Sequence, residues 1–193
     1  MKIAIINYGG GNIQSIKFAF QRLGYEAILT HDEGEIENAD KVVFPGVGEA
    51  SSAMKMLGES GLDTLIPTLG QPVLGICLGM QLMCRSSEEG KTVGLGIFDC
   101  DVVRFSNEVK VPQIGWNAIT DLKTKLFDGI PRTEYIYMVH SYYAPLCKET
   151  IATAEYGLPY SAALAKDNFY GVQFHPEKSS TVGEQILKNF LQL

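Results

Sequence analysis

The chain has 193 residues, 46% of them hydrophobic, and a formal net charge of −6 at pH 7. This length and apolar content predict one packed domain spanning residues 1–193 and argue against a disordered chain. The acidic balance argues against nucleic-acid binding, and no apolar run is long enough to cross a membrane. Four cysteines without a CxxC pair predict neither a zinc site nor disulfides. We therefore expect a cytoplasmic protein, because the N-terminus is too short for a signal sequence, and we expect no metal or cofactor.

The first half of the chain alternates short apolar runs with helical patterns. Strands are predicted at residues 2–7, 26–30, 41–44 and 73–76. Helices are predicted at residues 12–23, 50–57 and 78–85. The acidic stretch 32–40 indicates a solvated loop or the start of a helix. Strands separated by helices favour right-handed crossovers and therefore an α/β fold with an open, mostly parallel sheet flanked by helices.

The pattern changes after about Gly90, where strand-like runs follow one another with turns between them. These runs are residues 96–105, 113–119, 134–143, 151–156 and 162–174. A helical period returns at residues 182–190. The second half therefore adds antiparallel strands and makes the sheet a mixed one, before a closing helix.

Residues 73–81, with the sequence VLGICLGMQ, have the form of a nucleophile elbow. A buried strand runs into a helix at Cys77, and Gly75 and Gly79 flank it where side chains would crowd a sharp turn. Such a turn exposes the sulfur at the carboxyl end of the sheet and aims the first helical N–H groups at it. On its own, this pattern leaves two interpretations open, a nucleophile and a buried structural thiol.

A second motif near the C-terminus decides between them. Residues 170–177, YGVQFHPE, read as a strand running into a loop. If the strand persists to Glu177, the side chains of His175 and Glu177 project to the same side. A thiol, an imidazole and a carboxylate then provide nucleophile, general acid/base and orienting group. Of the other histidines, His31 is predicted at the surface, and His140 in the core or at the edge of a pocket.

Stabilising a tetrahedral intermediate also requires donors for its oxyanion. The sequence PGVG at residues 45–48 follows a predicted strand at the same edge of the sheet. The backbone N–H groups of Val47, Gly48 and Leu78 are the candidate donors. By itself, PGVG indicates only a tight turn.

Together, the elbow GICLGMQ and the HPE motif resemble the class I, or triad, glutamine amidotransferases, whose fold is flavodoxin-like. The resemblance covers the whole chain. It implies that Cys77 attacks the side-chain carboxamide of glutamine, that His175 delivers a proton to the departing ammonia, and that water hydrolyses the thioester. It also implies a substrate pocket lined by Gly46, Gln81, Ser141 and Tyr142.

Four further segments are similar to the family of glutaminase subunits of imidazole glycerol phosphate synthase. They are NYGGGN at residues 7–12, PGVG at 45–48, QIGWN at 113–117 and HSYY at 140–143. The resemblance implies that ammonia passes to a (β/α)₈ cyclase subunit in a heterodimer, giving imidazole glycerol phosphate and aminoimidazole carboxamide ribonucleotide in histidine biosynthesis. The implied partner-facing residues are Asn12, Trp116, Tyr137 and Lys178. Gln113 and Ile114 stand where that family suggests His-Met, a departure expected to affect partner fit more than catalysis.

Three alternatives stay open from the sequence. The first is the glutaminase subunit of pyridoxal phosphate synthase, against which QIGWN and HSYY speak. The second is a non-catalytic regulatory protein on the same fold, although no triad residue is missing. The third is a hydrolase with another substrate, such as a γ-glutamyl peptide. A partner is expected in any glutaminase of this length, because ammonia released into water becomes protonated and a chain of 193 residues leaves no room for an acceptor domain.

Overall fold

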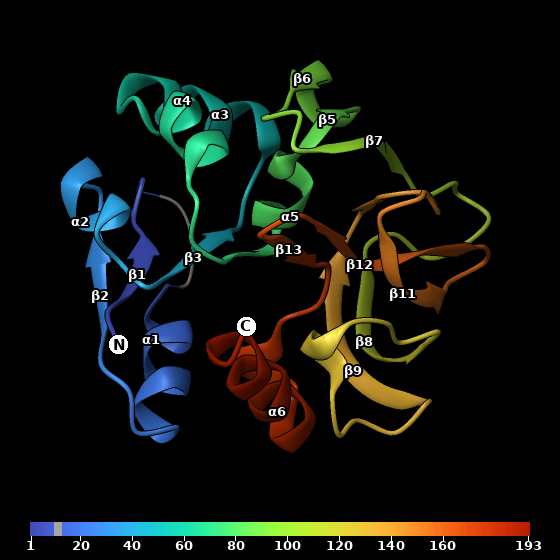
Figure 1. Ribbon diagram of the computed structural model, residues 1–193. Coiled ribbons are helices and arrows are strands. Elements are labelled where there is room, and N and C mark those ends of the chain that lie inside the picture. Colours follow the sequence, from blue (N-terminus) through green and yellow to red (C-terminus); the bar gives the residue numbers. More distant parts are fainter. Residues whose placement is uncertain (10–12) are drawn as a thin grey trace.

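The computed structural model describes residues 1–9 and 13–193 and contains two β-sheets with helices around them (Figure 1). Within these residues the larger sheet has nine strands in the order β2-β1-β3-β4-β13-β12-β11-β8-β9. The first five are mutually parallel: β2 (Ala27–Thr30), β1 (Ile3–Ile6), β3 (Lys41–Gly46), β4 (Val73–Cys77) and β13 (Phe169–Val172). The other four are antiparallel: β12 (Pro159–Lys166), β11 (Thr150–Glu155), β8 (Gln113–Thr120) and β9 (Glu134–His140). The predicted mixed α/β sheet is therefore confirmed.

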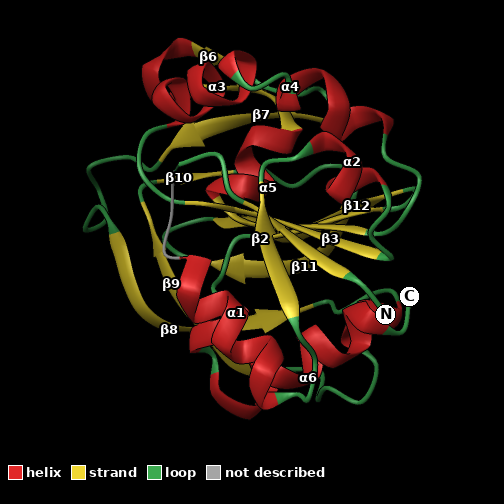
Figure 2. Cartoon of the chain, turned by 90° about the vertical axis from the view of Figure 1, so that its left-hand side faces the viewer, coloured by secondary structure: helices red, strands yellow, loops and turns green. Residues whose placement is uncertain are grey.

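Helices cover both faces of the parallel half, because alternate residues of its buried strands point to opposite sides. Ile3 and Ile5 pack in one hydrophobic cluster with α1 (Ile13–Arg22) and α6 (Ser180–Leu191). Ala4 and Ile6 pack in a second cluster on the other face. That cluster includes residues of α2 (Glu33–Glu37), α3 (Ala50–Glu59), α4 (Leu62–Leu65) and α5 (Leu78–Met83). Figure 2 shows α1 and α6 below the large sheet and the other helices above it.

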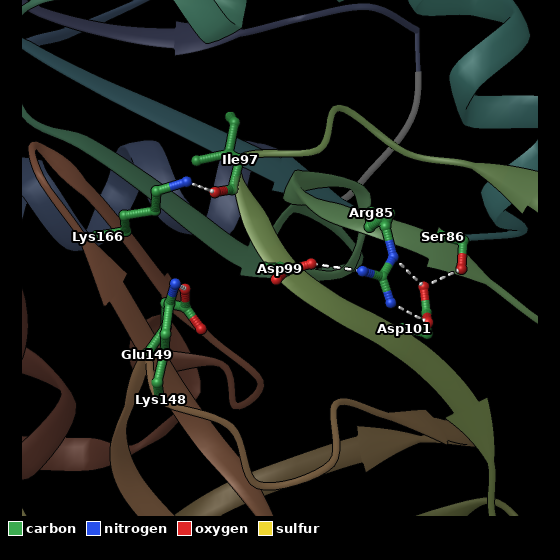
Figure 3. Close-up of polar contacts among 8 residues, drawn as sticks. All are labelled: Arg85, Ser86, Ile97, Asp99, Asp101, Lys148, Glu149 and Lys166. Carbon is green, nitrogen blue, oxygen red and sulfur yellow. Dashed lines mark hydrogen bonds and ion pairs between the residues drawn. The ribbon is translucent and has the colours of Figure 1, made fainter.

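The smaller sheet lies beside α5 and consists of four short strands. Its order is β10 (Tyr142–Tyr143), β7 (Phe98–Arg104), β5 (Cys84–Ser87) and β6 (Thr92–Val93). Arg85 of β5 binds Asp99 at 2.5 Å and Asp101 at 2.5 Å on the neighbouring β7 (Figure 3). Lys166 of β12 donates to the Ile97 carbonyl at 2.8 Å and so links the two sheets (Figure 3).

Several predicted boundaries are wrong, whereas the acidic stretch takes one of the two forms predicted for it. The predicted strand 162–174 is two strands, because Asp167 adopts φ 54° and turns β12 back into β13. The predicted run 134–143 divides into β9 and β10 at Ser141, and the two strands pair with different sheets. The predicted helix 78–85 ends at Met83, after which Cys84 begins β5. The acidic stretch contains the short helix α2, whose first turn is capped by Asp32.

No helix in the described ranges is long and apolar enough to span a membrane.

Candidate active site

Cys77 sits on a strained turn between β4 and α5. Its backbone has φ 54° and ψ −111°, a region that non-glycine residues rarely adopt. A side chain on Gly79 would collide with the carbonyl oxygen of Phe44, and one on Gly75 would lie 2.6 Å from the sulfur of Met83. Both glycines are therefore needed for α5 to fold back over the strands. The predicted nucleophile elbow is the observed geometry.

His175 and Glu177 reach the elbow from the segment after β13. Nδ1 of His175 lies 2.8 Å from Oε1 of Glu177, with side-chain exposures of only 5% and 2%. The condition that the strand persists to Glu177 is not met: β13 ends at Val172, and Pro176–Lys178 is a 3₁₀ turn. That tight turn, rather than strand alternation, brings the carboxylate beside the imidazole.

The imidazole of His175 links the carboxylate of Glu177 to the sulfur of Cys77. Burial lowers the pKa of His175, but hydrogen bonds with Cys77 and Glu177 and their negative charges outweigh it and raise the pKa to about 10. Because Nδ1 faces Glu177, Nε2 is the nitrogen left for the sulfur. The arrangement pairs a sulfur nucleophile with an imidazole that can exchange a proton with it, as attack on an electrophilic carbon requires.

The loop that carries His175 is tied to β9 by its backbone. The His175 N–H donates to the Tyr137 carbonyl at 3.1 Å. In the opposite direction, the Tyr137 N–H donates to the Ser179 hydroxyl at 3.0 Å, and this hydroxyl donates to the His175 carbonyl at 2.7 Å. An antiparallel strand far from the elbow in sequence thus fixes the position of the imidazole.

A cavity of about 330 Å³ opens over Cys77 and His175. It brings together most of the residues predicted for catalysis, for the oxyanion and for the substrate. These are Cys77, His175, Val47, Gly48, Leu78, Gln81, Ser141 and Tyr142. The volume is in the range of small-molecule sites, and the residues come from both halves of the sheet.

Gly46 does not line this cavity, although the sequence resemblance implies a place beside the substrate. It pairs with Cys77 across β3 and β4, and a side chain there would lie 2.8 Å from the Gly79 nitrogen. Because Gly46 has no side chain, β3 can approach the elbow closely. Gly46 therefore shapes the turn that carries Val47 and Gly48, instead of contacting the cavity itself.

Gln81 stands at the centre of a hydrogen-bonded chain beside Cys77. Its Nε2 donates to the Tyr142 carbonyl at 2.9 Å and to Oε1 of Gln173 at 2.9 Å. The amide nitrogen of Gln173 in turn lies 3.8 Å from the sulfur of Cys77. A carbonyl oxygen can only accept, so the contact with Tyr142 fixes the orientation of the Gln81 amide and, through it, that of Gln173.

Two polar side chains of this site are not among those predicted from the sequence. Gln173 is completely buried, and nothing in the motif QFHPE marks its side chain as pointing toward the sulfur rather than into the core. Glu89 lines the cavity and accepts from the Ala50 N–H at 2.9 Å. Burial raises the pKa of Glu89, whose carboxyl group is the acidic group among the side chains that line the cavity. Long-range folding, and no local pattern, brings both residues here.

The predicted partner-facing residues can be placed except for Asn12, which lies outside the described residues. Trp116 of β8 and Tyr137 of β9 are opposite each other in register, with ring centroids 6.2 Å apart. The ammonium group of Lys178 lies 6.0 Å from the centroid of the Tyr137 ring. These three side chains therefore form one cluster beside the cavity, which Lys178 also lines.

The β8–β9 hairpin exposes one apolar face around this cluster. Ile114 is 62% exposed, Trp116 53% and Tyr135 58%. Gln113, by contrast, is only 3% exposed, and its amide oxygen accepts from the Tyr160 hydroxyl at 3.0 Å. Of the two departures from the His-Met pattern, only Ile114 therefore lies on the exposed face. Alternation along the strand points Gln113 into the protein and Ile114 out of it.

The sequence model of the family "Glutamine amidotransferase class-I" matches residues 4–193. The chain belongs to this family. Among curated relatives, the "Imidazole glycerol phosphate synthase subunit HisH" of Bacteroides fragilis is 58% identical over 196 aligned positions, covering 100% of both chains. The protein of the same name from Yersinia pseudotuberculosis is 46% identical, again with both chains fully covered.

Solved structures support the fold of this class-I glutamine amidotransferase. A structure from Thermoplasma acidophilum, described as a GMP synthase subunit protein, has a TM-score of 0.78 at 22% identity, covering 100% of this chain and 92% of that one. The PurLQS structure from Thermotoga maritima has a TM-score of 0.74 at 14% identity, covering 99% and 97%. The predicted fold and family are confirmed.

Proposed function

We propose that this glutamine amidotransferase is the glutaminase subunit of an imidazole glycerol phosphate synthase, acting as a single domain over residues 1–193 in the cytoplasm. The observation that carries the proposal is the array of Cys77, His175 and Glu177 at a cavity, in a chain whose full-length relatives bear the synthase subunit name at 46–58% identity. A non-catalytic protein on this fold has no need of a buried His–Glu pair at an elbow cysteine.

Hydrolysis begins with attack of the Cys77 thiolate on the side-chain carboxamide carbon of glutamine. The carbonyl oxygen becomes an oxyanion, for which the backbone N–H groups of Val47, Gly48 and Leu78 are the candidate donors. One such donor typically lowers the activation barrier by about 3 kcal/mol. When the intermediate collapses, the C–N bond breaks, the imidazolium of His175 gives its proton to the leaving nitrogen, and a glutamyl thioester and ammonia result.

Water completes the cycle. The neutral imidazole of His175 removes a proton from water as it attacks the thioester, the C–S bond breaks, and glutamate and the Cys77 thiolate are formed. Glu177 keeps Nδ1 protonated and stabilises the charged ring in both half-reactions. Glutamine itself presents an α-ammonium group, for which the Glu89 carboxylate is the complementary charge in the cavity, and Gln81, Ser141 and Tyr142 supply polar groups along the wall.

Ammonia is the useful product, and the exposed β8–β9 face supports a partner that receives it. Isolated apolar residues are normal on a protein surface, but several together beside an active site indicate a docking face. Trp116 and Tyr137 contribute aromatic groups of the kind enriched in protein interfaces, and Lys178 adds a positive charge beside them. We assign this face to the (β/α)₈ cyclase subunit of the synthase, which uses ammonia to form imidazole glycerol phosphate.

The test is an assay of imidazole glycerol phosphate formation with added cyclase and its nucleotide substrate. The wild-type chain should support the reaction with glutamine, and Cys77→Ala should lose glutamine use by about 10³-fold or more while ammonium salts still sustain the cyclase. Cys147→Ala, which removes a half-buried thiol outside the cavity, is the matched control. Glutamine-dependent product formation that survives in Cys77→Ala would refute the assignment.

A further inference from the structure

The carbonyl oxygen of Tyr142 accepts two hydrogen bonds from side chains in the wall of the cavity. Nδ1 of His140 lies 2.7 Å from it, and Nε2 of Gln81 lies 2.9 Å from it. Because a carbonyl can only accept, His140 must carry its proton on Nδ1 and Gln81 must present its amide nitrogen. One backbone oxygen therefore sets the tautomer of a histidine and the orientation of a glutamine.

His140 is held in this position from its other side as well. Nε2 carries no proton in this tautomer and lies 3.4 Å from the hydroxyl of Tyr160. That hydroxyl has one proton, which it donates mainly to the amide oxygen of Gln113 at 3.0 Å, so its hold on the imidazole is the weaker of the two. Gln113 and His140 are cross-strand partners in the β8–β9 hairpin, and both side chains are buried. The ring of His140 further packs against Phe105, with centroids 5.4 Å apart. The imidazole thus has little freedom to turn.

The charge state of His140 suits a fixed donor rather than an acid or base. Burial lowers the pKa of His140 to about 4, aided by the nearby charge of His175 and opposed by the hydrogen bond with the Tyr142 carbonyl. At neutral pH the ring is therefore uncharged and has one N–H, which points at Tyr142. The triad already supplies the nucleophile, the acid/base and the orienting carboxylate, so His140 is left without a step of its own in the reaction.

We propose that His140 is a positioning residue for glutamine binding, whose Nδ1–H holds the Tyr142 carbonyl and thereby orients Gln81 toward the substrate. With Tyr142 and Gln173 occupying both N–H groups of Gln81, its Oε1 is the part of the amide left for glutamine. The inference rests on the proposed glutaminase function and adds the determinant of its substrate pocket. Gln113 and Tyr160 act indirectly, by restricting the orientation of the His140 imidazole.

The first test compares His140→Leu with His140→Asn in glutamine hydrolysis. The Asn amide nitrogen replaces Nδ1–H in position, whereas Leu has similar size and no donor. We expect His140→Leu to raise the KM for glutamine about tenfold, the equivalent of one lost hydrogen bond, with a smaller change in kcat. His140→Asn should restore KM to within about threefold of wild type. His31→Leu makes the same substitution at an exposed histidine and serves as the control.

Two further measurements separate positioning from a merely structural role. Alkylation of Cys77 by iodoacetamide needs the nucleophile but not the glutamine pocket, so its rate in His140→Leu should match that of wild type. Equal KM values in His140→Leu and wild type, or an equal rise in His140→Leu and His140→Asn, would overturn the proposal. Absence of glutaminase activity in the wild type would instead refute the function on which it rests.

Tyr160→Phe is a milder variant, which removes one hydroxyl and keeps the ring. If Tyr160 acts through His140, Tyr160→Phe should raise KM about threefold alone and add nothing in the His140→Leu background. Additive effects of the two substitutions would show that Tyr160 acts independently and would contradict this part of the inference. Should His140→Leu fail to fold, the same conclusion follows from Tyr160→Phe and His140→Asn, because unchanged KM in Tyr160→Phe would argue against the relay.

Discussion

The two walls of the cavity are built by different means. The elbow wall comes from the parallel half of the sheet, where the strained backbone of Cys77 and the close approach of Gly79 to Phe44 fix the nucleophile. The opposite wall comes from β9 and β10, where the carbonyls of Val139 and Tyr142 meet Cys77 and Gln81 through long-range hydrogen bonds. Backbone strain and steric packing therefore place Cys77, whereas hydrogen bonds between segments distant in sequence build the opposite wall.

The strongest test of the elbow wall is His175→Ala, which leaves the nucleophile without its acid and base. We expect glutamine hydrolysis to fall by roughly 10³- to 10⁴-fold in kcat, because neither ammonia departure nor water attack has a proton carrier. Steady-state glutaminase assays measure this. His31→Ala is the control, since that histidine is exposed and outside the cavity. A loss of less than tenfold would mean that another group performs the proton transfers.

The next largest effect tests whether glycine is sterically required at the elbow. Gly79→Ala places a methyl group against the Phe44 carbonyl, which belongs to a buried strand and cannot move away cheaply. We expect the free energy of unfolding to fall by roughly 3–5 kcal/mol, measured by urea denaturation. Gly70→Ala is the matched control, because a methyl group there meets no neighbouring atom and the change should lie within about 0.5 kcal/mol. A Gly79→Ala variant as stable as wild type would show that the elbow can relax.

The difference between the two walls also explains which residues of the site could be predicted from the sequence. Cys77 and its glycines form a local pattern, and the ends of parallel strands meet at one edge, so the elbow and His175 could be predicted from the chain alone. Gln173 and Glu89 could not be found in this way, because their roles depend on which distant side chain they meet. The burial of Gln113 could not be predicted for a related reason: a strand has two faces, and the sequence QIGWN does not say which face is buried.

A third prediction concerns the charge that Glu177 imposes on His175. In the folded protein the pKa of His175 is raised from 6.5 to about 10, partly by the hydrogen bond with Glu177 and by its charge. Glu177→Gln removes that charge, so the pKa must fall and the imidazolium must be lost at lower pH. We expect kcat to drop roughly 10²-fold at neutral pH and the alkaline limb of the pH–rate profile to move to lower pH. An alkaline limb that stays in place, or moves upward, would contradict the assigned role of Glu177.

The raised pKa of His175 also makes the free energy of unfolding depend on pH. Because the folded pKa of His175 exceeds its unfolded value of 6.5, its charged form stabilises the folded state fully below pH 6.5. That contribution is lost as the pH rises through about 10. In Glu177→Gln the upper end of this window should move to lower pH, which urea denaturation at several pH values would detect. Gln21→Ala, at an exposed position of α1, changes no titratable group and gives a control with unchanged pH dependence.

The smallest expected effect concerns Trp116, on the exposed outer face of the β8–β9 hairpin. Trp116 packs on Tyr137, whose backbone holds the His175 loop on both sides, so the exposed hairpin face lies one residue from the triad. If the cyclase docks there, Trp116→Ala should weaken its binding by about 2 kcal/mol, or roughly 30-fold in Kd, measured by titration calorimetry. Val93→Ala removes an apolar side chain that is 77% exposed on β6, in the other sheet, and should leave Kd unchanged. Equal Kd values for the two variants would mean that the partner does not use the hairpin, and that the antiparallel half serves glutamine recognition alone.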